Sequence, residues 1–190
     1  MHKLVNNRMP MREARAKAKS NLDFGLMSLT YKFRDFLLPR ISILKEVGIK
    51  VGFHVLDFGC GPGSYIMPLA ELVGESGKIY ALDVHPLAIR AVQRIASRKL
   101  LENVQTILSD CKTGLPPNRL DVVLLYDTLH HLDEPDRVLA ELHRVLKTKG
   151  ILSVSDHHLK QDEIISRVTN RGLFKPSAKC KRTYSFSGEK

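Results

Sequence analysis

Short apolar runs alternate with amphipathic segments along most of the chain. Continuous runs of Val, Ile and Leu predict strands that are buried on both faces, as in a parallel sheet. Between these runs, apolar positions recur at intervals of three and four residues, which predicts helices. We expect strands at 54–58, 78–84, 104–108, 120–126 and 151–155, and helices at 65–73, 86–101 and 135–146.

Further elements are expected at the two ends of the chain. A short polar helix is predicted at 11–19 and an amphipathic helix at 29–47, which Pro39 bends or breaks and Gly48 ends. After the fifth strand we expect a helix at 162–169 and two short strands, 173–180 and 182–187. Strands alternating with helices indicate right-handed crossovers. The fold class is therefore α/β: a doubly wound, Rossmann-like, mostly parallel seven-stranded sheet with an antiparallel C-terminal hairpin.

A glycine-rich turn follows the first predicted strand, and it reads Asp57-Phe58-Gly59-Cys60-Gly61-Pro62-Gly63. Glycine has no Cβ, so the backbone of such a turn can approach a ligand closely. The N-terminus of the helix that follows favours an anion, such as a carboxylate. The loop alone also fits dinucleotide-binding enzymes.

Two acidic residues follow the next two predicted strands. Asp83 ends the second strand, about 20 residues after the glycine loop, where doubly wound folds place the carboxylate that binds ribose hydroxyls. Asp110 follows the third strand. The alternative for Asp83 is a capping role for the helix that begins near Pro86. All these groups are predicted at the carboxyl ends of strands, where open α/β sheets bind ligands.

These segments resemble the motifs of class I S-adenosylmethionine-dependent methyltransferases. The glycine loop resembles their motif I, Leu82-Asp83-Val84-His85 their motif II, and Leu108-Ser109-Asp110-Cys111 their adenine-contacting segment. The run from Tyr126 to Leu132 resembles their fourth-strand motif. The resemblance covers about 47–158 and is closest to the branch that methylates small molecules in ubiquinone and menaquinone biosynthesis. One departure is Lys147-Thr148-Lys149-Gly150, which lacks the proline usual in that turn.

The resemblance implies S-adenosyl-L-methionine as the cofactor. It also implies that the glycine loop binds the methionine half of this cofactor. Gly59, Gly61 and Gly63 would line this half, with Cys60 packed beneath the cofactor. Asp57 would orient the loop and meet the methionine ammonium group. Cys60 is also close to a helix N-terminus, where a thiol can be reactive, but we expect it to be a small packed residue.

The resemblance also assigns the adenosine half and the reacting end of the cofactor. Asp83 would accept hydrogen bonds from both ribose hydroxyls, and Val84 would pack beside the adenine. Asp110 would accept from the adenine amino group, and Cys111 would offer a backbone amide nearby. Tyr126, at the end of the fourth strand, would border the sulfonium and its methyl group.

His130 and His131 follow the fourth strand and are the candidate catalytic residues, as a general base for an acceptor that must lose a proton. The alternative is a structural role for this pair. His157 and His158 follow the fifth strand and face the same crevice in this topology. Adjacent histidines point to opposite sides of an extended chain, so we expect no metal site.

The basic charge of the chain leaves other methyl acceptors, such as RNA or protein, as alternatives. The net charge is +10, with Lys and Arg concentrated at both ends, so an RNA or protein methyltransferase of the same fold is the first alternative. A non-catalytic cofactor-binding subunit is the second. A nicotinamide dehydrogenase is weaker, because the loop lacks Gly-x-Gly-x-x-Gly spacing. Tyr126-Asp127-Thr128-Leu129 lacks the Asn/Asp-Pro-Pro-aromatic tetrapeptide of DNA adenine methylases. A small-molecule acceptor is favoured over nucleic acid.

The remaining expectations concern domains, assembly and location. Residues 1–48 are expected to form helices that partly cover the acceptor site, with Tyr31 and Phe33 as contacts, and 49–190 the cofactor-binding domain. No run approaches the roughly 20 apolar residues that span a bilayer. Three widely spaced cysteines indicate reduced thiols in a cytoplasmic protein. A monomer and a homodimer both stay open.

Overall fold

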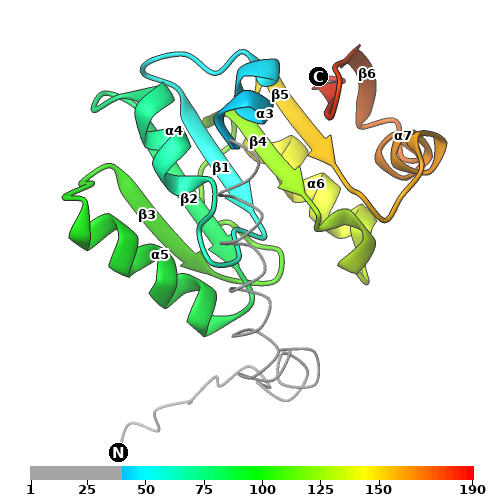
Figure 1. Cartoon of the computed structure of the whole chain (residues 1–190). Helices are drawn as coiled ribbons and strands as arrows, with labels where there is room; N and C mark the ends of the chain where they lie inside the picture. Colours follow the sequence, from blue (N-terminus) through cyan, green and yellow to red (C-terminus); the bar gives the residue numbers. More distant parts are fainter. Residues whose placement is uncertain (1–39) are drawn as a thin grey trace, which may run out of the picture.

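A computed structural model describes residues 40–190, and their elements are numbered as in Figure 1. The strands are β1 His54–Phe58, β2 Lys78–Asp83, β3 Val104–Leu108, β4 Leu120–Tyr126, β5 Leu146–Ser155, β6 Phe174–Lys179 and β7 Tyr184–Gly188. The helices are α3 Arg40–Val47, α4 Ile66–Val73, α5 Pro86–Arg98, α6 Pro135–Val145 and α7 Gln161–Thr169, and the 3-10 turn η1 covers Leu129–His131. The helix expected at 11–19 and the first part of the one expected at 29–47 lie outside the described residues.

The seven strands form one sheet in the order β3-β2-β1-β4-β5-β7-β6. β3, β2, β1, β4 and β5 pair in parallel, whereas β7 pairs antiparallel with both β5 and β6. The chain moves from β1 outward to β3 and then returns to place β4 on the other side of β1. Doubly wound sheets bind their ligands in a crevice at such a reversal, which here is at the carboxyl ends of β1 and β4. The expected fold class is confirmed.

Helices cover both faces of the sheet (Figure 1). Alternate residues of β1 point to opposite faces: Val55 packs in the cluster with α3, α4 and α5, and Leu56 packs in the cluster with α6 and α7. β4 alternates in the same way, with Leu124 on the first face and Leu125 on the second. The continuous apolar runs of the sequence thus reflect strands buried on both sides.

α3 is tied both to the sheet and to the C-terminal hairpin. Its residue Leu44 is fully buried in the cluster with α4 and α5. The Glu46 carboxylate accepts hydrogen bonds from Arg182 N and Thr183 Oγ1, each at 3.1 Å. The described part of the segment 1–48 therefore packs as part of the same core as the sheet.

β5 begins five residues earlier than the expected 151–155. Leu146 pairs with Leu120, and the register then shifts so that Ile151 pairs with Val122. The segment between these pairs is a compact irregularity rather than a separate turn. A Cβ on Gly150 would lie 2.7 Å from Leu146 Cδ2, so the close packing here requires glycine.

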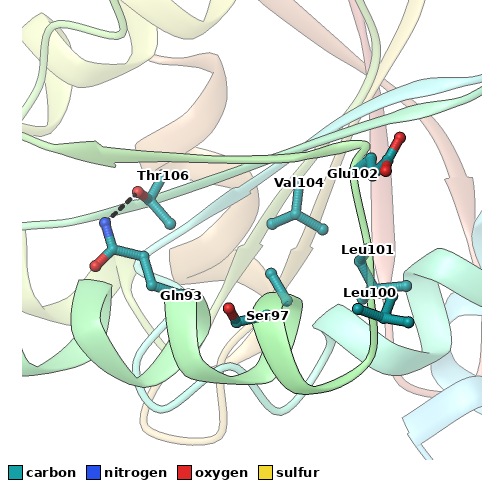
Figure 2. A pocket seen from close by; sticks show the side chains of 8 residues that line it. Gln93, Ser97, Leu100, Leu101, Glu102, Val104 and Thr106 are labelled. Atoms are coloured by element: carbon teal, nitrogen blue, oxygen red, sulfur yellow. Dashed lines mark hydrogen bonds between the residues drawn. The ribbon is translucent and has the colours of Figure 1, made fainter.

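A shallow hollow lies between α5 and the edge strand β3 (Figure 2). Gln93 Nε2 donates a hydrogen bond to Thr106 Oγ1 at 3.1 Å on its polar side, and Leu100 and Leu101 lie on its apolar side. Since Leu100 and Leu101 precede β3, the hollow extends to the amino end of that strand. It is separate from the crevice at the carboxyl ends. Within residues 40–190, no helix has the length and apolar character that a bilayer span requires.

Candidate cofactor and acceptor site

The glycine loop after β1 has three left-handed glycines with different surroundings. The φ angles of Gly59, Gly61 and Gly63 are +79°, +51° and +87°, in a region that side chains rarely adopt. A Cβ on Gly59 would lie 2.3 Å from Thr128 Oγ1, and one on Gly63 would lie 2.9 Å from Ile95 Cδ1. A Cβ on Gly61 would meet no atom within 4 Å. Gly59 and Gly63 are thus required by internal packing, and Gly61 is the position open to a ligand.

The amides of this loop bond within the protein. Gly59 N and Cys60 N both donate to Leu82 O, at 2.8 and 3.0 Å, and Gly61 N donates to Asp83 Oδ2 at 2.9 Å. The sequence led us to expect amides directed at a ligand, whereas these three are directed at β2 and its last residue. These hydrogen bonds fix the shape of the loop. The loop would therefore serve a ligand by allowing it to approach the backbone at Gly61.

Asp83 ends β2 with its carboxylate held by two backbone amides. Oδ2 accepts from Gly61 N, and Oδ1 accepts from His85 N at 2.8 Å. Burial raises the pKa of Asp83 above its ordinary value, and these amide hydrogen bonds oppose part of the rise. A carboxylate has about four acceptor positions, so about two remain for the hydroxyls of a ribose. The α5 cap is His85, whose Nδ1 accepts from Leu87 N at 3.1 Å, so capping does not account for Asp83.

Asp57 is a buried carboxylate within β1. Asp57 is only 2% exposed, and its Oδ2 has no hydrogen-bond partner among the described residues. Burial and, to a smaller extent, the nearby charge of Asp83 raise the pKa of Asp57 to about 7, and Arg40 opposes part of this rise. Leaving a buried acceptor unsatisfied is costly. A cationic hydrogen-bond donor at Asp57 would remove this cost.

Tyr126 closes the carboxyl end of β4 as part of an aromatic wall. Its hydroxyl lies 2.9 Å from Ser153 Oγ, and its ring meets the Tyr65 ring edge-on with centroids 5.2 Å apart. Arg40 Nη1 donates to the Tyr65 hydroxyl at 2.7 Å. Burial raises the pKa of Tyr126 far above its ordinary value, so its hydroxyl stays neutral. Tyr65 follows the glycine loop in the chain, so this ring pair links the carboxyl end of β4 to the segment between the loop and α4.

The ends of β2 and β3 leave a more exposed surface. Val84 and Leu108 are 49% and 60% exposed, which is unusual for large apolar residues beside a buried sheet. Asp110 is also exposed. The amide of Cys111 donates to Ser109 Oγ at 3.2 Å, so it is engaged within its own turn. Two apolar side chains and a carboxylate are what a flat heterocycle with an amino group would contact.

The two cysteines assigned to the site have protonated, packed thiols. Burial raises the pKa of Cys60 well above its ordinary value, and the charges of Asp57 and Asp83 add to the rise. Burial also raises the pKa of Cys111. A thiol that stays protonated is a poor nucleophile. This agrees with the expected packing role of Cys60.

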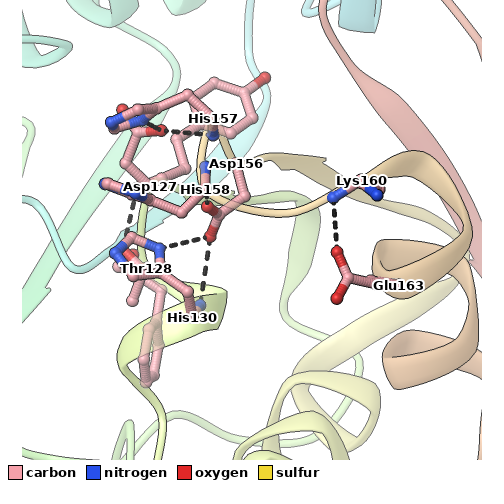
Figure 3. Close-up of polar contacts among 10 residues, drawn as sticks. Asp127, Thr128, His130, Asp156, His157, His158, Lys160 and Glu163 are labelled. Atoms are coloured by element: carbon pink, nitrogen blue, oxygen red, sulfur yellow. Dashed lines mark hydrogen bonds and ion pairs between the residues drawn. The ribbon is translucent and has the colours of Figure 1, made fainter.

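Four histidines gather at the carboxyl ends of β4 and β5 (Figure 3). The ring centroid of His130 lies 3.8 Å from that of His131 and 4.3 Å from that of His158. The ring centroids of His157 and His158 are 3.9 Å apart. His130 Nδ1 is 2.8 Å from an oxygen of Asp156. The histidines that the sequence places after β4 and β5 thus form one cluster of contacting rings.

The geometry of the first pair corrects one expectation. We expected His130 and His131 to point to opposite sides, which holds for an extended chain. η1 is a helical turn instead, and it brings the two rings together with their centroids 3.8 Å apart and their planes tilted by 43°. Among residues 40–190 the structure has no group of three or more His, Cys, Asp or Glu side chains arranged to hold a metal ion.

A family of proteins described as methyltransferase domains matches residues 49–183, which is most of the chain. The chain belongs to this family. Among curated relatives, the demethylmenaquinone methyltransferase of Geobacillus stearothermophilus is 30% identical over 129 residues, which cover 67% of this chain and 55% of the relative. The ubiquinone/menaquinone biosynthesis C-methyltransferase UbiE of Pseudoalteromonas translucida is 25% identical over 146 residues, covering 76% of this chain and 58% of the relative. This methyltransferase domain thus spans little more than half the length of these two relatives.

A solved structure resembles the methyltransferase domain over nearly its whole length. A SAM-dependent methyltransferase from Aquifex aeolicus superposes with a TM-score of 0.72 at 28% identity, covering 85% of this chain and 96% of that one. Together with the family match, this confirms the expected class I methyltransferase family, its fold, and S-adenosyl-L-methionine as the cofactor of the family. The individual site residues rest on the geometry described above.

The polar groups of this methyltransferase domain fit S-adenosylmethionine. Asp57 has an unpartnered buried oxygen suited to an ammonium group, and Asp83 keeps acceptor capacity suited to two hydroxyls. Gly61, whose amide binds Asp83, has open space where a side chain would be. These positions converge on one edge of the sheet, since the Gly61 amide bonds directly to Asp83 and the charge of Asp83 acts on Asp57.

Sequence reasoning missed several residues that shape this methyltransferase site. Thr128 lies against Gly59, and its Oγ1 donates to Tyr126 O at 2.9 Å. Asp156 holds His130, and Arg40 holds Tyr65. Asp156 directly follows the fifth predicted strand, the same signal that singled out Asp83 and Asp110, so the pattern could have found it. Thr128 and Arg40 carry no comparable signal.

Gly59→Ala and Gly61→Ala are expected to separate packing from ligand approach. Gly59→Ala should lower the free energy of unfolding by at least about 2 kcal/mol, because the left-handed backbone and the Thr128 side chain both oppose a methyl group. Gly61→Ala should cost only about 1 kcal/mol, from the backbone alone. It should nevertheless weaken S-adenosylmethionine binding. Urea unfolding and calorimetry measure the two effects.

The double variant Gly59→Ala/Thr128→Ala is the control for this pair. It removes the Thr128 atoms nearest to the added methyl group, so it should recover part of the stability that Gly59→Ala loses. Equal losses of stability in Gly59→Ala and Gly61→Ala would contradict the assignment of Gly59 to internal packing.

Proposed function

We propose that this protein transfers a methyl group from S-adenosylmethionine to a small-molecule acceptor. The observation that carries the proposal is the polar edge at β1 and β2, which combines the unpartnered Asp57 oxygen, the Asp83 carboxylate and the open space at Gly61, whose amide binds Asp83. Asp57 would take the methionine ammonium group and Asp83 the ribose hydroxyls. Val84 and Asp110 would take the adenine, with Cys111 packed behind.

S-adenosylmethionine supplies a methyl group activated by the positive charge on its sulfur. The residues of the chain therefore need to bind and orient the reactants and exclude water. The buried rings of Tyr126 and Tyr65 provide an apolar wall for the methyl end. His130 and His131 are the proposed general bases for an acceptor that must lose a proton.

The names of the relatives favour a quinol-like acceptor within this proposal. The curated relatives act in demethylmenaquinone methylation and in ubiquinone and menaquinone biosynthesis. Residues 1–48 are proposed to contribute the acceptor-site cover, and 49–190 the cofactor-binding domain. A cytoplasmic location also belongs to the proposal, and the free thiols of Cys60, Cys111 and Cys180 support it. The RNA-directed alternative rests on the net charge of +10 alone.

Two measurements test the proposal. Calorimetry should show that the full chain binds S-adenosylmethionine and not NAD. A cell extract is then incubated with the protein and S-adenosylmethionine labelled in its methyl group, and divided into low-mass, RNA and protein fractions. Unreacted S-adenosylmethionine is removed from the low-mass fraction, and label is expected in the compounds that remain there.

The other outcomes each exclude a part of the proposal. Label in RNA or protein would replace the small-molecule acceptor with the corresponding alternative. Cofactor binding without any labelled product would indicate a binding subunit. Absence of cofactor binding would exclude the methyltransferase activity itself.

A further inference from the structure

We propose that Asp156 is a positioning residue that makes His130, rather than His131, the general base of the reaction. This inference rests on the proposed methyltransferase function and assigns roles within its acceptor site. Asp156 follows β5, and His130 lies in η1 after β4, so a carboxylate and an imidazole from neighbouring strands meet at the carboxyl edge of the sheet (Figure 3).

Asp156 makes contacts that fix both its own side chain and the ring of His130. Its side chain has no exposed surface. Oδ2 lies 2.8 Å from His130 Nδ1 and accepts from His130 N at 3.2 Å, and Oδ1 accepts from His158 N at 3.1 Å. Both oxygens are therefore engaged, and the carboxylate cannot rotate without breaking a hydrogen bond.

This arrangement sets the tautomer of His130. An ionised carboxylate only accepts hydrogen bonds, so the 2.8 Å contact places the hydrogen on Nδ1 of the neutral ring. Nε2 then carries the lone pair, which is the state that a general base requires. The His130 side chain is 16% exposed, so its ring is largely buried but keeps some accessible surface.

The loop that carries His130 lies against the glycine loop. Thr128, two residues before His130, approaches Gly59 so closely that a Cβ there would lie 2.3 Å from Thr128 Oγ1. Tyr126, at the start of the same loop, forms the wall beside the methyl end. His130 is thus anchored next to the proposed cofactor site. His131, in contrast, is exposed, and its ring contacts that of His130 at a tilt of 43°.

The proposed step moves one proton and one methyl group. An electron pair of the acceptor forms the new bond to the methyl carbon, and the pair of the broken carbon–sulfur bond stays on sulfur. The proton that the acceptor loses passes to Nε2 of His130 and from there to water. Asp156 does not take the proton; its charge orients the ring and stabilises the imidazolium that forms.

The cluster also provides a matched control. His157 Nδ1 lies 2.7 Å from Asp127 Oδ1, and the His157 side chain is 58% exposed. This second pair has the same chemistry but lies at the surface. Asp127 has a φ of +49°, a conformation that asparagine tolerates well, so Asp127→Asn should preserve the backbone.

The test compares Asp156→Asn with Asp127→Asn in the full chain. In the 15N spectrum of the histidine rings, His130 of the unsubstituted protein should carry its hydrogen on Nδ1. Asp156→Asn should lose this preference and lower the maximal rate of label transfer to the low-mass extract fraction at least about tenfold, since general bases contribute far more than this. In both variants the dissociation constant for S-adenosylmethionine should stay within about twofold, because neither Asp156 nor Asp127 is among the proposed cofactor contacts. Asp127→Asn should change the His157 signal and leave the rate unchanged.

His130→Asn covers the case in which Asp156→Asn fails to fold. Asparagine can place its amide N–H near the position of Nδ1 and keep the hydrogen bond to Asp156, while the basic Nε2 is lost. It should retain most of the stability and lose the activity, and its spectrum identifies the His130 signal. The proposal is overturned if His130 carries its hydrogen on Nε2, or if either variant keeps its rate within twofold. A wild-type protein that transfers no label would exclude the proposed function, whereas an active wild type with unaffected variants would exclude this inference alone.

Discussion

Replacing Asp83 with alanine is expected to weaken S-adenosylmethionine binding about 100-fold, which corresponds to about 3 kcal/mol. The carboxylate keeps about two acceptor positions after its bonds to Gly61 N and His85 N, and both would serve ribose hydroxyls. Hydrogen bonds to a charged group contribute about 1.5–3 kcal/mol each, so losing two should exceed the effect of any neutral contact in the site. The substitution also leaves the Gly61 amide without its acceptor, which loosens the loop beside the ligand. Calorimetric titration of the full chain measures the change.

Asp121→Asn is the control for this measurement. Asp121 is at the opposite end of β4, where its carboxylate accepts from His54 N at 2.8 Å and pairs with Lys147 at 2.6 Å. It should lose stability and leave the affinity for S-adenosylmethionine unchanged. An Asp83→Ala protein that binds within about twofold of the wild type would contradict the ribose assignment, because even one lost charge-assisted bond costs more than 1 kcal/mol.

The hydrophobic pattern predicts the sheet well because its signals are local. β1, β3 and β4 have the expected bounds, and polar residues or glycine mark most of their ends, as Gly59 does after β1 and Asp127 does after β4. β5 is the exception: its first residue, Leu146, is joined to the strand only by pairing with Leu120 across a register shift. That pairing depends on tertiary packing, and no feature of the local sequence encodes it.

The candidate site is predictable as a set of positions but not as a set of contacts. The order of strands places Asp57, Asp83 and Tyr126 at one edge, and this follows from the alternation of strands and helices. The bond from Gly61 N to Asp83 and the contact between the rings of His130 and His131 depend on loop conformations, which side-chain periodicity does not describe. The glycines illustrate the same limit, because the sequence gives three similar residues and only the packing shows that Gly61 alone is open.

Asp57→Asn is expected to stabilise the protein while weakening its binding of S-adenosylmethionine. Burial and the charge of Asp83 raise the pKa of Asp57 to about 7 in the folded protein, from the ordinary value of 3.8. The folded state therefore binds this proton more tightly than the unfolded state does, and stability falls as the pH rises between these two values. Each pH unit in this window costs about 1.4 kcal/mol, so the wild type should lose about 2–3 kcal/mol between pH 5 and pH 8 through this group.

The asparagine side chain has no charge to bury, so the variant should escape this loss. Relative to the wild type, its free energy of unfolding in urea should be higher at pH 8 than at pH 5 by about 2–3 kcal/mol. Asp121→Asn should lower stability at both pH values, since it removes the negative charge that pairs with Lys147. Binding should weaken because a neutral amide attracts an ammonium group less than a carboxylate does. A stability difference that does not change with pH would contradict the raised pKa of Asp57. Stabilisation together with lost affinity would mean that the fold tolerates a buried charge at Asp57 because cofactor binding requires it.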